Sequence, residues 1–201
     1  MPLLENQVLG ALGRQDILRR AWGIDDGIFR YDVYELTLDR RWQPPQPNGA
    51  ADRETVWGGF ARYLGSDLGG LEFWNGRPIS LTLYWQGIAP ADGDYMTYIH
   101  LRDAAGEVIA AWDGPTALQA GTTPPRYYST LLWQPGEYIA DTRTLRIDEA
   151  DLTVGGGYRL VIGMYDLATQ TRVPVSIDGA PAGDGYTIDD RIQWTLPPSN
   201  G

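Results

Sequence analysis

The chain has no cysteine, no lysine and only one histidine, His100, among its 201 residues. Without cysteine it has no disulfide framework, no thiol nucleophile and no cysteine-based zinc site. Without lysine it has neither a Schiff-base nucleophile nor a P-loop. The single histidine excludes any site that needs two imidazoles.

Negative charge dominates the chain, since 26 acidic residues face 16 arginines and the net charge is −10. A surface of this sign repels phosphate backbones and anionic lipids, so we expect no nucleic-acid partner. No apolar run approaches the length of about 18 residues that a spanning helix needs, so no direct membrane insertion is expected. The first residues lack a basic segment followed by an apolar core, so we expect no signal peptide. On these grounds the protein is either cytoplasmic or a piece of a longer chain.

What the chain does contain favours β-structure. It has 25 glycines, 14 prolines and 11% aromatic residues. The usual helix formers of protein surfaces, lysine and glutamate, are absent or scarce. This composition is typical of many short strands joined by turns.

From residue 57 onward, strand signals recur at short intervals. In residues 79–85 the side chains of Ile79, Leu81, Leu83 and Trp85 alternate with others, as in a strand with one buried face. Residues 159–165 are apolar on both faces, as a central strand should be. The pattern predicts an all-β fold, an antiparallel two-sheet β-sandwich of jelly-roll type, over residues 57–201. The predicted strands are 57–64, 68–74, 78–87, 95–102, 107–113, 127–133, 137–147, 157–166, 171–177 and 190–196.

Two hairpin turns look alike, at residues 103–106 and 166–170. Each begins with an aspartate, whose side chain can bond the backbone further along the turn. Gly106 can supply the positive φ that closes such a turn, and Gln170 does so less easily.

Residues 1–56 are predicted to form an N-terminal appendage outside the sandwich. The best helical pattern covers residues 3–20, but two glycines interrupt it, so this part is helical or irregular. Residues 31–38 read as a strand that either pairs away from the main body or closes a sheet edge, and we expect it to add to an edge. The proline-rich residues 41–49 read as an extended linker.

Catalysis is not predicted. A pair of carboxylates could hydrolyse a glycosidic bond, but nearly all aspartates lie in predicted turns. The acidic residues expected on strands, Asp141, Glu107 and Glu137, do not form an evident pair. His100 is expected to be half-buried and satisfied by the backbone, and no cofactor is predicted.

Metal binding is left as an alternative. The loops 92–94 and 184–190 offer carboxylate oxygens, so a structural calcium at the sandwich edge is possible. Neither loop has the ligand spacing of an EF-hand, and no metal-ligating residue is assigned.

Aromatic side chains suggest where a ligand would bind. Tyr84 points away from the apolar stripe of its strand, and Tyr98 and His100 share a face of the next strand. If these strands form a hairpin, the three side chains lie close together and can hydrogen-bond a sugar that stacks on them. Trp74 and Trp112 are possible additions to the site. The competing interpretation is that another segment covers these residues and that they only pack.

Six short segments of the chain occur in a familiar order. They are 63–67 (YLGSD), 81–85 (LTLYW), 98–103 (YIHLRD), 133–137 (WQPGE), 157–166 (GYRLVIGMYD) and 172–175 (RVPV). In order and spacing they resemble the β-sandwich domain that follows the membrane region of bacterial glycosyltransferases of the dolichyl-phosphate-mannose mannosyltransferase-like type. The resemblance covers residues 57–177, although the second hairpin turn has Gln170 where the family pattern has glycine.

The resemblance implies an extracytoplasmic accessory domain, on the cell-surface or periplasmic side and part of a membrane-anchored protein. Its implied partners are the glycosyltransferase region and a glycan or lipid-linked sugar, and it carries over no catalytic residue. The first hypothesis is therefore a non-catalytic module that binds glycan or cell envelope. The alternative is a structural or protein-interaction domain without a small ligand, and a hydrolase ranks third.

Overall fold

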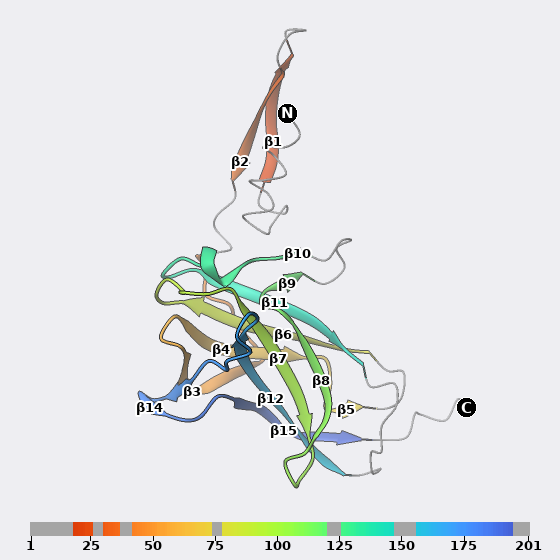
Figure 1. The fold of residues 1–201 in the computed structure, drawn as a ribbon. Coiled ribbons are helices and arrows are strands. Elements are labelled where there is room, and N and C mark those ends of the chain that lie inside the picture. Colours follow the sequence, from red (N-terminus) through yellow and green to blue (C-terminus); the bar gives the residue numbers. More distant parts are fainter. Residues whose placement is uncertain are drawn as a thin grey trace, which may run out of the picture.

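The computed structural model describes residues 18–25, 30–36, 42–73, 78–119, 126–146 and 156–194. Within them the fold is all-β, with two sheets packed face to face as a β-sandwich, as the sequence predicts (Figure 1). The six-stranded sheet has the order β11 (Tyr138–Leu145), β6 (Ile79–Gly87), β4 (Ala61–Leu68), β3 (Gly49–Trp57), β13 (Val175–Ile177) and β14 (Ala180–Pro181). The five-stranded sheet has the order β5 (Glu72–Phe73), β15 (Tyr186–Trp194), β12 (Gly157–Asp166), β7 (Tyr95–Arg102) and β8 (Val108–Pro115).

The chain changes sheet repeatedly, so few neighbouring strands are consecutive in sequence. It crosses between the two sheets of the sandwich after β4, β5, β6, β8, β11, β12 and β14. Such crossings are the connections of Greek-key sandwiches. The pairs within the two sheets are antiparallel except for β15 and β5, which run parallel.

The core fills the space between the two sheets. The predicted stripe of Ile79, Leu81, Leu83 and Trp85 is confirmed, because each of these side chains is at most 1% exposed. Across the core lie the alternate residues of β7 and β12. The indoles of Trp57 and Trp85 meet edge to face, with ring centroids 5.2 Å apart. Burial of this aromatic and aliphatic set is what holds the sheets together.

Both predicted turns are confirmed. In the first, Asp103 Oδ1 accepts from the Glu107 amide at 2.9 Å and Gly106 has φ of 93°. In the second, Asp166 Oδ1 accepts from the Thr169 amide at 2.7 Å, and Gln170 adopts a positive φ of 57°.

Two expectations about the N-terminal part are wrong. Residues 18–20, which end the predicted helix, belong to strand β1 (Leu18–Asp25), which pairs with β2 (Arg30–Leu36) as a separate two-stranded sheet (Figure 1). Strand β2 therefore does not add to a sandwich edge. It pairs with β1, the strand just before it in the sequence, because closing a short loop costs little conformational entropy. Residues 1–17 of the predicted helix lie outside the described residues.

Other segments also differ from the sequence-based expectations. Strand β3 is part of the six-stranded sheet, so the sandwich includes residues from Gly49 onward, ahead of the predicted boundary at 57. Residues 127–133 are not one strand. They hold the end of β10 (Arg126–Tyr127), which pairs with β9 (Leu118–Gln119), and the 3-10 turn Thr130–Leu132. Ser129 caps that turn by accepting from the Leu131 amide. No helix within the described ranges is long and apolar enough to cross a membrane.

Candidate functional site

Tyr98 and His100 lie together on the outer face of the five-stranded sheet, as predicted for this pair. Their ring centroids are 4.5 Å apart, and both side chains point away from the core residues Ile99 and Leu101 of the same strand. Both are nevertheless covered, since Tyr98 is 1% exposed and His100 is 8% exposed. Neither ring is therefore an open platform on which a sugar could stack.

Tyr84 does not join them. Strand β6 pairs with β4 and β11, whereas β7 pairs with β8 and β12 in the other sheet. The predicted hairpin between these strands is wrong, and so is the three-residue cluster that depended on it. On the outer face of the six-stranded sheet, Tyr84 donates its hydroxyl hydrogen to Asp67 Oδ2 at 2.7 Å. Burial, with a smaller effect from Asp67, raises the pKa of Tyr84 to about 12.

The two tryptophans proposed as additions are not brought to this face either. Trp112 pairs in register with Ile99, so it faces the core side of β8, where it packs against the core. Its indole Nε1 donates to the Arg146 carbonyl at 3.2 Å. Trp74 lies outside the described residues.

Tyr98 is buried because its neighbours leave space for its ring and cover it. The paired residue on β12 is Gly163, where a Cβ atom would overlap the Tyr98 ring. The Arg172 guanidinium covers the ring, with Cζ 4.3 Å from the ring centroid. The Tyr98 hydroxyl donates to the Asp184 carbonyl at 2.8 Å. Burial raises the pKa of Tyr98, so the phenol is protonated at neutral pH.

His100 is held as a neutral imidazole. Arg102 Nη2 lies 3.5 Å from His100 Nδ1, and since a guanidinium can only donate, Nδ1 must accept. The proton then sits on Nε2, which lies 3.9 Å from Asp113 Oδ1. Burial lowers the pKa of His100, and the nearby Arg172 and Arg102 act in the same direction, while Asp113 opposes them.

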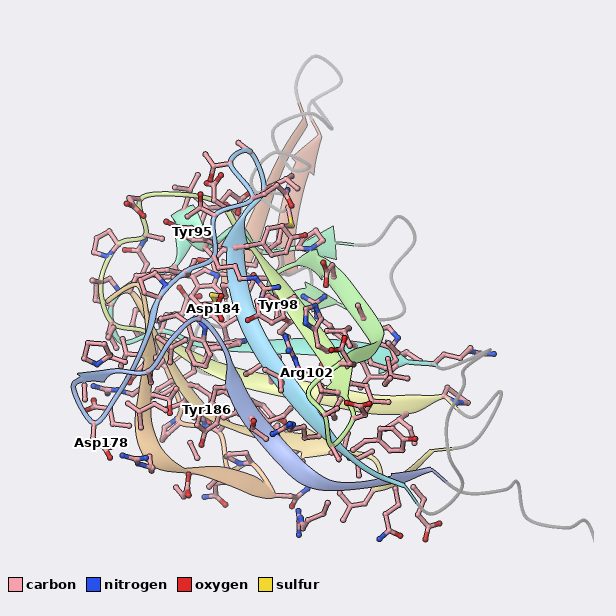
Figure 2. The ribbon with its side chains drawn as sticks, turned by 60° about the horizontal axis from the view of Figure 1, so that its bottom comes forward. Tyr95, Tyr98, Arg102, Asp178, Asp184 and Tyr186 are labelled. Carbon is pink, nitrogen blue, oxygen red and sulfur yellow. The ribbon has the colours of Figure 1, made fainter. Side chains whose placement is uncertain are left out.

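A cavity opens beside Tyr98 on this outer face and has a volume of about 340 Å³. Strands β7, β12 and β15 form its floor, and the β14–β15 connection forms a wall. Figure 2 shows Tyr98, Arg102 and Asp184 close together over β7 and β12. The lining residues are Tyr98, Arg102, Gly106, Arg159, Val161, Ala182, Gly183, Asp184, Gly185 and Thr187.

The wall is fixed by backbone contacts. The Val175 amide donates to the Gly183 carbonyl and the Ala182 amide donates to the Val175 carbonyl, both at 2.8 Å. Gly183 has a positive φ of 91°, and a Cβ at Gly185 would lie 2.9 Å from the Tyr98 hydroxyl oxygen. The two glycines thus allow the wall to bend closely over Tyr98.

Two arginines give the cavity its charge. Arg102 and Arg159 are directly opposite each other in the β7–β12 register, so both project from the same face. Arg102 Nη1 donates to the Gly106 carbonyl at 3.0 Å, and Arg159 Nη2 donates to the Asp103 carbonyl at 3.4 Å. The Nε of Arg102 is buried and donates to no acceptor in the described structure.

Neither arginine was predicted from the sequence as a site residue. A signal was present for Arg102, because it shares the strand face of Tyr98 and His100 by simple alternation. For Arg159 no local signal existed, since its place opposite Arg102 follows from pairing between strands more than 50 residues apart in sequence.

The carboxylates considered for hydrolysis have local partners instead. Asp141 is fully buried and binds Arg143 through both oxygens, with Oδ1 3.1 Å from Nε and Oδ2 3.0 Å from Nη2. Glu137 Oε2 accepts from the Gln134 amide at 2.9 Å and from the Tyr128 hydroxyl at 3.2 Å. In loop 92–94, Asp94 Oδ1 accepts from Ser129 Oγ at 2.8 Å. Among the described residues, no three carboxylates or histidines gather as a metal site.

Comparisons with known proteins give no family. No family model matches the chain, and no curated protein matches it. Among solved structures, the C-terminal domain of Wzt is 12% identical with a TM-score of 0.44, over 75% of this chain and 82% of that one. The Pseudomonas fluorescens alkylpurine DNA glycosylase AlkC, bound to DNA containing an abasic site analog, is 14% identical with a TM-score of 0.36. This match covers 69% of the chain described here and spans only 31% of AlkC. At these TM-scores neither likeness bears on function.

Proposed function

We propose that this sandwich is a non-catalytic saccharide-binding module and that its site is the cavity lined by Arg102, Arg159, Val161, Thr187 and the wall 182–185. The observation that carries the proposal is the convergence of polar groups on one open cavity of about 340 Å³. That volume lies at the lower end of the range of about 300–1,000 Å³ typical of small-molecule sites.

The chemistry of the lining suits a polyhydroxylated ligand. The guanidiniums of Arg102 and Arg159 donate only, the Thr187 hydroxyl donates and accepts, and the wall supplies main-chain groups. Sugar hydroxyls also donate and accept, so they can satisfy all three kinds of group. Val161 offers a small apolar surface against which the carbon face of a sugar ring can lie.

The proposal of a binding module rather than an enzyme rests on what the candidate acid–base groups already do. His100 is covered and neutral, and Asp141 and Glu137 are bound to neighbouring side chains away from the cavity. Asp184 is the carboxylate on the cavity lining, and its Oδ2 lies 3.7 Å from Arg172 Nε. Hydrolysis by the usual route needs two carboxylates flanking one bond.

The cellular setting stays a proposal that rests on the sequence resemblance alone. We propose an extracytoplasmic accessory domain that works beside a membrane glycosyltransferase region. Co-purification of such a region with the tagged protein from solubilised membranes would support this setting. Recovery of the protein from the cytosolic fraction alone would contradict it.

A glycan array followed by calorimetry tests the binding function. We expect at least one saccharide to bind wild-type protein and to lose most of its affinity in Thr187→Trp, because the indole would fill the cavity. The matched control is Thr144→Trp, which places the same indole at an exposed position on the outer face of the six-stranded sheet. No binding to any array glycan, or equal losses in the two variants, would overturn the proposal in favour of a structural or protein-interaction domain.

A further inference from the structure

The cavity carries a local charge opposite to that of the whole chain. The net charge of the protein is −10, yet two of its 16 arginines line this one small space. Neither Arg102 nor Arg159 forms an ion pair with a carboxylate within 4.0 Å among the described residues. The contrast matters because isolated positive groups on an acidic protein attract anions that the rest of the surface repels.

The two arginines are also placed where they repel each other. They are directly opposite in an antiparallel pair and project from one face, and like charges in this arrangement destabilise a sheet. Their acceptors in the described structure are all neutral: the Gly106 carbonyl, the Asp103 carbonyl at 3.4 Å and His100 Nδ1 at 3.5 Å. A negative group between them would relieve the repulsion.

Arg102, which lines the cavity, has one buried donor without an acceptor. Arg102 Nε is buried and makes no hydrogen bond in the described structure. A buried donor without an acceptor is costly, and such groups in native proteins need an explanation. An anion in the cavity would supply the acceptor once the Arg102 side chain turned its Nε toward it, because Nε and one Nη form a planar fork that fits two oxygens.

From these observations we infer that the cavity selects saccharides that carry a negative charge, as a carboxylate of the uronic acid kind, and that Arg102 and Arg159 hold that charge. The inference rests on the proposed saccharide-binding function and specifies its ligand class. Thr187 and the wall 182–185 then contact the hydroxyls of the same sugar. The other charged groups around the site leave room for this, since Asp184 lies by Arg172 and Asp113 by His100.

The test compares one saccharide with and without its charge. A uronic acid oligosaccharide and its fully methyl-esterified form, which is neutral, are titrated into wild-type protein by calorimetry. We expect the acid to bind at least about tenfold more tightly than the ester. We also expect its affinity to fall as salt rises from low to physiological concentration.

Variants then assign the charge to the arginines. Arg159→Gln and Arg102→Gln should each weaken binding of the acid about tenfold or more, with little change for neutral sugars. The control Arg53→Gln changes the net charge equally but removes an exposed arginine of the six-stranded sheet, paired with Asp178, and should leave affinity unchanged. Loss of a repelling partner should leave the melting temperature of Arg159→Gln equal to or above that of wild type.

The outcomes separate this inference from the proposed function. Equal binding of acid and ester that Thr187→Trp abolishes would keep the saccharide site and overturn the charge selection. Competition by sulfate or phosphate ions as strong as by the uronic acid would show a plain anion site and overturn the inference too. No binding of any saccharide would overturn both proposals.

Discussion

At the scale of single residues, Tyr98 shows how much of this face depends on glycine. Its ring lies over Gly163 on the neighbouring strand, under the Arg172 guanidinium and beside Gly185. A side chain at either glycine would occupy space that the ring fills. The covered tyrosine in turn forms one side of the cavity and holds the wall through the Asp184 carbonyl.

We predict that Gly163→Ala destabilises the domain by about 1–3 kcal/mol, the usual cost of overpacking a filled site. The matched control is Gly157→Ala on the same strand, where an added Cβ meets nothing within 4 Å. Urea unfolding measures both variants. Equal free energies of unfolding for the two would mean that Tyr98 does not lie over Gly163 in solution.

The single histidine gives a pH-dependent stability. Burial lowers the pKa of His100 in the folded protein below its ordinary value of about 6.5. The unfolded chain therefore takes up a proton at a higher pH than the folded one does. The free energy of unfolding is highest above pH of about 6.5 and falls as the pH is lowered toward the pKa of the folded state.

We predict that His100→Gln reduces this loss of stability between about pH 7.5 and pH 5.5, because the amide does not titrate but can still accept from Arg102. Thermal unfolding at stepped pH values measures it, and the interval lies above the range in which most carboxylates titrate. Identical pH profiles for wild type and variant would contradict the buried, neutral imidazole.

The alternation of residues along the strands predicted well which side chains are buried, but it predicted poorly which strands pair. The stripe from Ile79 to Trp85 is buried as expected, because alternation alone decides which side of a strand is apolar. The placement of Tyr84 beside Tyr98 failed, because alternation is silent about which strand pairs with which. Tyr98 and His100 share a face as predicted, but Tyr98 is covered by Arg172 and the wall 182–185, which are far away in sequence.

At the scale of elements, the turn after β12 holds a non-glycine residue in the left-handed region. Gln170 has φ of 57°, and its amide donates to the Asp166 carbonyl at 2.8 Å. Glycine adopts this conformation without strain, whereas a β-branched side chain does not.

We therefore predict that Gln170→Val costs about 1–2 kcal/mol of unfolding free energy, while Gln170→Gly costs little or nothing. Thr171→Val, at the next and exposed position, is the control and should stay within about 0.5 kcal/mol of wild type. Chemical denaturation ranks the three. If valine is tolerated as well as glycine at position 170, the turn does not have the geometry described.

A buried ion pair joins edge strands of the two sheets. Asp141 and Arg143 on β11 point into the sandwich, and Arg143 Nη2 also donates to the Pro115 carbonyl of β8 at 2.7 Å. Removing one charge of a buried pair costs more than removing both.

We predict that Arg143→Met lowers the free energy of unfolding by about 3–5 kcal/mol. The double variant Asp141→Leu with Arg143→Met should be more stable than the single variant, since no buried carboxylate then loses its guanidinium. Denaturant unfolding of the single and the double variant measures this difference in the free energy of unfolding. A single variant as stable as the double one would show that the pair is hydrated in solution.

At the scale of the whole molecule, composition and strand spacing predicted the class of fold, and strands β7 and β12 have the predicted bounds. Composition and strand spacing could not predict the sheet order, because the chain crosses between sheets and pairs strands far apart in sequence. The cavity depends on that order, since β7, β12 and β15 meet only after these crossings. This is why the sequence indicated part of one strand of the site and missed its arginines and its wall.

The most direct test of the account is where a bound saccharide lies, measured by amide chemical-shift changes in the labelled protein. The saccharide that binds most strongly on the array is titrated in, with Thr187→Trp as a second sample. We predict that the amides of Arg159, Gly183, Gly185 and Thr187 shift in wild type and not in the variant, while the outer face of the six-stranded sheet around Tyr84 stays unchanged. Shifts centred on Tyr84, or shifts that persist in Thr187→Trp, would contradict the cavity as the binding site.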